Sequence, residues 1–98
     1  MWKTDLKSHE NIVLTCQETG QEAFIAPCPD SIDSVLVGGD GTVDGERQLD
    51  STNPFTMLDN SVNLYLGQGR LRTGRIRLAV EAPQSIKITK SNNINHAE

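Results

Sequence analysis

The residues whose types could do chemistry are cations that gather near the end of the chain. Between residues 70 and 90 six bases face a single acid, Glu81. These bases are Arg70, Arg72, Arg75, Arg77, Lys87 and Lys90. Cations of this kind bind the phosphates of nucleic acids, and arginine also reads base edges through its planar fork. The arginines in and beside the Gly-rich stretch 67–74 therefore form either a solvated turn or contacts to the backbone of a polyanion.

The other reactive residues form no catalytic or metal-binding pattern. Cys16 and Cys28 stand alone, without Cys-x-x-Cys or histidine spacing, so neither zinc nor redox chemistry is indicated. We expect two half-buried thiols, with a disulfide between them as the open alternative. The acidic run at residues 40–46 superficially suggests calcium but lacks the ligand alternation of an EF-hand. We expect no catalytic residue, no metal and no cofactor, and we do not expect an enzyme.

Alternating segments position the late cations. Residues 75–81 alternate apolar and polar side chains, which is typical of a strand with one buried face. Pro83 breaks the ladder because proline has no N–H to donate, and alternation resumes at residues 86–90. Val80 and Ile88 are predicted in the buried layer on opposite sides of this corner. Residues 62–66 predict one more strand before the Gly- and Arg-rich loop.

The start of the chain predicts a hairpin. Residues 11–17 form the first strand, residues 19–21 the turn and residues 22–26 the second strand. Residues 1–10 are expected to be a polar, loosely ordered extension.

Length and composition indicate one small domain, residues 1–98, with a thin core. Only 36% of the residues are hydrophobic and four are aromatic, and small β proteins of this kind often gain burial by dimerising. The net charge of −4 is uneven, because residues 27–60 hold seven acids against Arg47 alone. A segment of that length is either functional or partly disordered, with an extra hairpin possible at residues 34–43. No apolar run approaches the roughly 18 residues of a membrane helix, so we expect a soluble, cytoplasmic protein without membrane contact.

The order of residues 61–90 resembles the carbon storage regulator family (CsrA/RsmA), small RNA-binding translational regulators. The resemblance is carried by S-V-N-L-Y-L-G, then R-I-R-L-A-V-E-A-P, then the short strand I-K-I at residues 86–88. The opening hairpin is similar too, since Leu14 and Thr15 match the family's start. The family's two following arginines are replaced here by Cys16 and Gln17, and residues 27–60 stand where the family has a tight turn.

The resemblance implies an all-β, five-stranded fold in an interlocked homodimer, with an acidic insertion at 27–60 and a short tail at 91–98. The first strand of one chain would lie beside the fifth strand of its partner and form one composite surface with it. That surface would bind single-stranded GGA in hairpin loops of messenger or small RNA and so control translation. Lys90 stands where the family usually has an arginine that contacts RNA. The predicted RNA-binding residues are Leu14, Thr15, Cys16, Gln17, Arg70, Arg72, Gln84, Ile86, Ile88, Thr89 and Lys90.

The alternative is a protein-interaction module that has lost RNA binding and meets its partner through the acidic insertion. The position of residues 27–60 separates the two hypotheses. An insertion lying away from the composite surface leaves RNA binding open, whereas an insertion folded over it would repel phosphate.

Overall fold

All regular structure in the described part of the chain is β-strand. The computed structural model describes residues 1–28, 31–67 and 75–92. The strands are β1 (Trp2–Lys7), β2 (Glu10–Cys16), β3 (Glu22–Pro27), β4 (Ser34–Gly39), β5 (Gly45–Gln48), β6 (Phe55–Met57), β7 (Val62–Leu66), β8 (Arg75–Glu81) and β9 (Ile86–Asn92). Within those residues no helix is long and apolar enough to cross a membrane. The all-β prediction is confirmed, but the described strands number nine rather than five.

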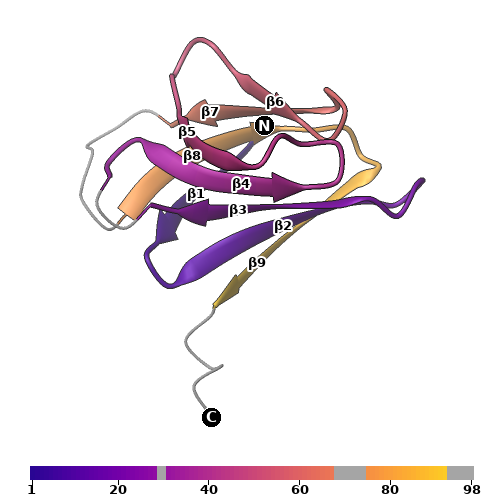
Figure 1. Cartoon of the computed structure of the whole chain (residues 1–98), viewed down its shortest axis with the longest axis horizontal. Coiled ribbons are helices and arrows are strands. Elements are labelled where there is room, and N and C mark those ends of the chain that lie inside the picture. The colour runs from indigo at the N-terminus through magenta and orange to yellow at the C-terminus, as the bar shows by residue number, and fades with distance from the viewer. Residues whose placement is uncertain (29–30, 68–74, 93–98) are drawn as a thin grey trace.

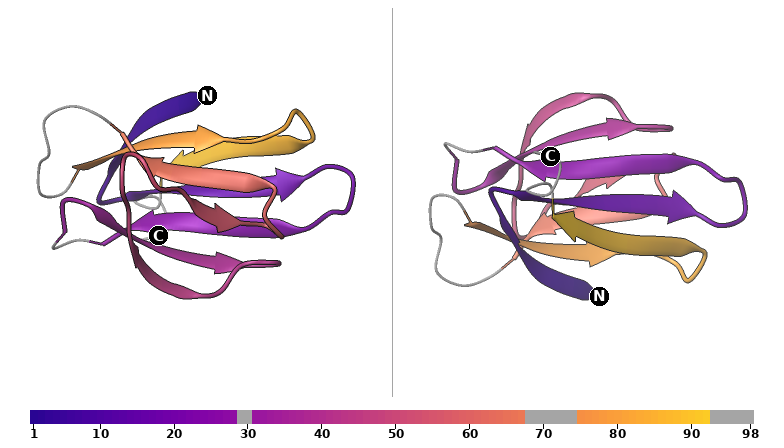
Figure 2. Two further views of the ribbon diagram at one scale, coloured as in Figure 1. Left: turned by 90° about the horizontal axis from the view of Figure 1, so that it is seen from above. Right: turned by 90° about the horizontal axis from the view of Figure 1, so that it is seen from below.

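The strands form two antiparallel sheets that pack face to face. Sheet A has the order β1-β8-β7-β6, and sheet B has the order β5-β4-β3-β2-β9. Figure 1 and Figure 2 show the two layers. Alternate residues of each strand point inward, so the core combines both sheets, with Leu14 and Ile25 from sheet B and Leu64 and Leu78 from sheet A fully buried.

The corner at Pro83 carries the chain from one sheet to the other. β8 lies in sheet A and β9 in sheet B, and the main-chain N–H of Ile86 donates to the carbonyl of Pro83 at 3.1 Å. Val80 is buried as predicted, whereas Ile88 is only half-buried against the core. The two strands and the break between them are therefore confirmed, and β9 runs two residues farther than expected.

The opening hairpin is also confirmed, and its first strand pairs with β9 of the same chain. Leu14 of β2 lies opposite Ala23 of β3 on one side and opposite Ile88 of β9 on the other. Gly20 takes a positive φ of 79° in the turn, a conformation that glycine adopts without steric cost. The neighbouring strands that the resemblance draws from two chains are thus supplied by one.

Residues 1–10 are not a loose extension. Trp2, Thr4 and Leu6 point inward from β1, which pairs with β8 along its whole length, and Leu6 is fully buried. The turn at residues 8–9 then leads into β2 of the other sheet. A short period-2 pattern with a single strong apolar residue is enough to form β1, because β8 supplies the main-chain hydrogen-bond partners.

The described residues of the acidic segment 27–60 belong to both sheets, so they are not a partly disordered insertion. β4 and β5 form a hairpin at the edge of sheet B, so the extra hairpin is confirmed with its second strand shifted to residues 45–48. β6 closes the far edge of sheet A. Leu49, Met57 and Leu58 are buried in the shared core, so the segment supplies apolar residues that the thin core lacked.

Candidate functional site

The surface predicted from the resemblance is assembled by β2, β9 and the turns at one end of them. Thr15 lies opposite Lys87, and Val13 lies opposite Thr89, on the outer face of sheet B. Gln17 donates its main-chain N–H to the carbonyl of Ser85 at 2.7 Å, which brings it beside the turn that contains Gln84. Four predicted residues, Thr15, Gln17, Gln84 and Thr89, therefore present side chains on one connected surface.

The other predicted residues are placed differently. Leu14 and Ile86 point into the core, and Cys16 and Ile88 are half-buried against it. Leu14 also has paired main-chain neighbours on both sides, so it offers a ligand neither side chain nor free backbone groups. Arg70 and Arg72 lie outside the described residues.

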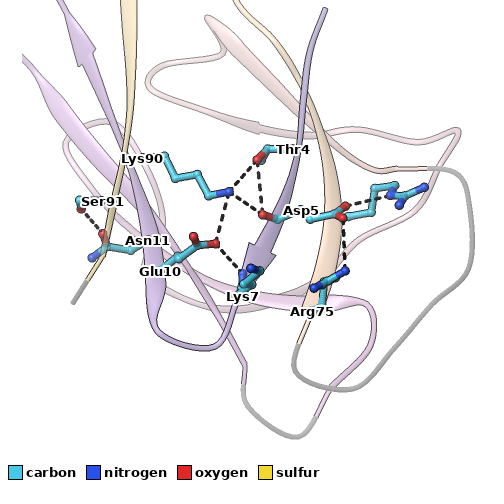
Figure 3. Close-up of polar contacts among 9 residues, drawn as sticks. Thr4, Asp5, Lys7, Glu10, Asn11, Arg75, Lys90 and Ser91 are labelled. Carbon is cyan, nitrogen blue, oxygen red and sulfur yellow. Dashed lines mark hydrogen bonds and ion pairs between the residues drawn. The ribbon is translucent and has the colours of Figure 1, made fainter. Parts of the chain in front are cut away.

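Lys90 points to the inner side of β9 and closes one open side of the sandwich. Its ammonium donates to the carbonyl of Asp5 at 2.7 Å and to the hydroxyl of Thr4 at 3.0 Å, and it lies 3.3 Å from the carboxylate of Glu10 (Figure 3). The main-chain N–H of Lys7, which donates to Glu10 at 2.9 Å, is the main cause that lowers the pKa of Glu10. The hydrogen bond and charge of Lys90 lower it further. An inward-pointing charge on an edge strand is a known device against edge-to-edge pairing. Lys90 therefore joins β9 to β1 within the chain.

A second inward cation lies at the opposite side of the sandwich. Arg47, on edge strand β5 of sheet B, stands over the ring of Phe55 on edge strand β6 of sheet A, with 5.5 Å between its guanidinium carbon and the ring centroid. Each open side thus has a cation from sheet B that reaches toward sheet A.

The two cysteines have different surroundings and lie far apart. Hydrogen bonds from the side chain and, to a smaller extent, the main chain of Thr19 lower the pKa of Cys16. Burial raises the pKa of Cys28. The main-chain N–H of Cys16 donates to the carbonyl of Gln21 across the turn. Cys28 follows Gln21 by seven residues along β3, so it lies about 23 Å from Gln21 at the usual rise of a strand. A disulfide needs Cα atoms within about 7 Å. Both thiols are free, and the open alternative of a disulfide within the chain is excluded.

The described strands of the acidic segment do not cover the β2–β9 surface, although Asp40 and Asp59 from its loops contact Glu22 and Gln21 at the β2–β3 turn. Its strands β4 and β5 lie beyond β3 in sheet B, and β6 lies in the other sheet. Asp44 and Glu46 of this segment nevertheless stand on the outer face of sheet B at the β5 side, and Glu22 of β3 stands on the same face. Lys87 is the cation of the described strands on that face, so the face is acidic.

The described cations gather instead on the outer face of sheet A, which the sequence analysis did not single out. Lys3 and Lys7 point outward along β1, and on β8 Arg75 lies opposite Lys7 while Arg77 lies opposite Asp5 between the two lysines. The carboxylates on this face are Asp5, opposite Arg77, and Glu81, opposite Asn63. The alternation of inward and outward residues along Trp2–Lys7 is the sequence signal for β1 and so for this face. The same residues also fit a loose polar extension, which is how the sequence analysis interprets them.

A hollow of about 690 Å³ lies on this outer face of sheet A. Ala79 forms part of its floor, only 5% exposed, with Tyr65 on one side and Lys3 on the other in the same cross-strand row. Ala79 has the shortest side chain of the row, between the longer side chains of Tyr65 and Lys3. The row therefore combines an aromatic ring, a shallow apolar floor and a cation.

An ion pair borders the hollow in the next row. The Nε of Arg77 donates to Asp5 at 2.9 Å, and Arg75 stands 4.0 Å from the same carboxylate (Figure 3). The hydrogen bond from Arg77 lowers the pKa of Asp5, and Asp5 raises the pKa of Arg77. A Cβ on Gly67 would collide with Cγ of Arg77, so glycine just after β7 leaves room for the stem of the Arg77 side chain. Asp5 thus orders both arginines and offsets part of their charge.

Within the described residues no group of three or more His, Cys, Asp or Glu side chains is arranged to hold a metal ion. Comparison with known proteins found no matching family model, no matching curated protein and no matching solved structure. The resemblance to the carbon storage regulator family therefore rests on the residues of the sequence alone.

Proposed function

We propose that the protein binds single-stranded RNA through the outer face of sheet A. The observation that carries the proposal is the separation of charge between the two faces of the sandwich. Lys3, Lys7, Arg75 and Arg77 stand on the outer face of sheet A, whereas acids dominate the outer face of sheet B. Because phosphate contacts supply much of the affinity for nucleic acid, RNA is expected on the basic face.

The hollow beside Tyr65 suits an unstacked base. Single-stranded RNA is recognised by aromatic side chains that stack on bases and by cations that follow the backbone. Tyr65 would supply the ring, Lys3 a phosphate contact beside it, and Lys7 a second contact about 13 Å along the same strand. Asp5 keeps Arg75 and Arg77 in place, so we expect the two lysines to supply the larger share of new phosphate contacts.

The finer properties come from the resemblance and stay predictions. The preferred RNA is a hairpin loop that displays GGA, and its binding controls translation in the cytoplasm. The interlocked homodimer also stays a prediction, which sedimentation at micromolar concentration tests. A site on the outer face of sheet A needs no second chain, because all of its described residues belong to one sandwich.

The test is fluorescence anisotropy with a labelled GGA hairpin and a CCA hairpin of the same fold. Tyr65→Leu is expected to weaken binding about tenfold, because stacking on an aromatic ring contributes roughly 1–3 kcal/mol per base. Lys3→Gln should weaken binding. It should also reduce the slope of log K against log salt concentration by about 0.7, the value for one phosphate contact of a single strand. The matched controls are Phe24→Leu and Lys87→Gln on the opposite face, and both should bind as the wild type does.

The possible outcomes are distinct. A loss with Lys87→Gln but not with Lys3→Gln would return the site to the β2–β9 surface. Equal binding of the GGA and CCA hairpins would remove the sequence preference that the resemblance implies. No binding to either hairpin would overturn the RNA proposal.

The second candidate function is protein interaction. The observation that favours it is the outer face of sheet B, where exposed apolar side chains stand among carboxylates. This face belongs partly to the acidic segment, which the sequence analysis named as a surface for a protein partner.

A further inference from the structure

The outer face of sheet B presents two large apolar side chains to solvent. Phe24 of β3 is 42% exposed and Leu36 of β4 is 41% exposed. Phe24 lies opposite Gly38, and Leu36 lies opposite Ala26 in the neighbouring row, so the two side chains are diagonal neighbours. Val13 extends the patch on the other side of Phe24. Such a cluster on one sheet face differs from the singly scattered apolar residues of an ordinary surface.

Gly38 brings an aromatic ring and a carboxylate together. A Cβ at Gly38 would lie 2.7 Å from Cε1 and Cζ of Phe24 and 2.8 Å from Oδ1 of Asp44. The ring and the carboxylate oxygen therefore meet over the bare backbone of one glycine. Asp44 is held there because its Oδ1 accepts the main-chain N–H of Gly39 at 3.1 Å. The carboxylate is thus positioned before any ligand arrives.

This pairing of groups recognises an organic cation. The face of an aromatic ring attracts guanidinium and ammonium groups, and a carboxylate beside it supplies the opposite charge. Glu22 and Glu46 stand on the same face, one on each side of the apolar patch. An arginine suits the site better than a lysine, because its planar guanidinium stacks on a ring and donates to a carboxylate at once.

We propose that the outer face of sheet B docks a basic segment of a partner protein, with an arginine on Phe24 beside Asp44 and an apolar residue on Leu36. Charge complementarity selects this occupant, since the carboxylates that attract an arginine repel phosphate and another acidic surface. The proposal rests on the second candidate function, protein interaction, and names its partner; because the surface lies on the opposite side of the sandwich from the proposed RNA face, it does not depend on RNA binding.

The probe is a short fluorescein-labelled peptide in which arginine alternates with leucine, compared with a peptide in which glutamine replaces each arginine. The wild-type protein should bind the arginine peptide more tightly, and salt should weaken that binding. Phe24→Leu keeps an apolar side chain and should weaken binding about two- to fivefold through the lost ring. Asp44→Asn keeps the acceptor for Gly39 and should weaken binding by up to about fivefold.

Matched controls keep the test specific. Glu81→Gln removes a carboxylate from the outer face of sheet A, and Tyr65→Leu removes an aromatic ring there, so both should bind the peptide as the wild type does. Thermal unfolding confirms that each variant is folded, and the large exposed fraction of Phe24 favours this. The double variant Phe24→Leu, Asp44→Asn should lose about tenfold.

Three results would overturn the proposal. The first is equal binding of the arginine and glutamine peptides by the wild-type protein. The second is unchanged peptide binding in the double variant. The third is a wild-type protein that self-associates in sedimentation and becomes monomeric in Phe24→Leu, because the face would then be covered by a second copy of the chain.

Discussion

Replacing Lys90 by methionine is expected to lower the free energy of unfolding by about 1–2 kcal/mol. Methionine keeps an unbranched apolar stem and removes only the ammonium, which contacts Thr4, Asp5 and Glu10. Hydrogen bonds to a charged group contribute roughly 1.5–3 kcal/mol, and exposed ion pairs less than about 1 kcal/mol. The Lys90 side chain is 30% exposed and loses rotamer freedom, so the net effect falls toward the lower values.

The assay is urea unfolding followed by circular dichroism, with thermal melting as a second measure. A loss of 1 kcal/mol should lower the melting temperature by about 4–8 °C in a domain of this size. Lys87→Met is the matched control, because Lys87 lies on the outer side of the same strand and is exposed. Its stability should stay within about 0.5 kcal/mol of the wild type. Equal stability of the two variants would refute the conclusion that Lys90 joins the two sheets.

Three further predictions concern the core, the thiols and acid stability. Val80→Asp should unfold the protein, because Val80 is 1% exposed and an unpaired buried carboxylate costs several kcal/mol; normal melting by circular dichroism would show that the inner face of β8 is misassigned. Iodoacetamide near neutral pH should alkylate Cys16, whose pKa is lowered, faster than buried Cys28, whose pKa is raised, and equal rates by mass spectrometry would contradict this. Asp5 and Glu10 have lowered pKa values, so their stabilisation is present above the ordinary carboxyl pKa of about 4 and is lost as pH falls through the folded-state values. The variant Asp5→Asn, Glu10→Gln should therefore melt with a weaker dependence on pH between about 5 and 2, and an unchanged profile would contradict this contribution.

The strands with long alternating patterns could be predicted from the sequence. Residues 75–81 keep one apolar face in phase, Ile86 and Ile88 resume it in the next strand, and Pro83 marks the break between them. The same holds for the β2–β3 hairpin, whose turn contains a glycine with positive φ. In each case a local period and a local breaker carry the information.

The edge strands are harder to predict from the sequence, because their formation depends on pairing with strands that are distant in the chain. β1 has one fully buried residue, Leu6, and depends on β8 for its backbone partners. In the segment 27–60 the inward apolar residues are Val35 and Val37 of β4 and Met57 of β6, and loops that contain acids separate these two short strands. Composition alone therefore suggested a solvated insertion where the chain completes both sheets.

The candidate sites show the same limit. The resemblance predicts Lys90 as an RNA contact because it stands where the family usually has an arginine, but its partners Thr4 and Asp5 come from the other end of the chain, 86 and 85 positions away. The basic face also depends on β1 lying beside β8, which no local pattern reveals. Residue types indicated a cation-rich surface, and only the strand order gave its position.

The most direct test of the proposed RNA face is amide chemical-shift mapping of ¹⁵N-labelled protein titrated with a GGA hairpin. The proposal predicts that the largest changes fall on Lys3, Tyr65, Arg77 and Ala79, around the hollow on the outer face of sheet A. Thr15, Lys87 and Thr89, on the outer face of sheet B, should change little. Changes concentrated on these three residues, or no changes at all, would contradict the assignment.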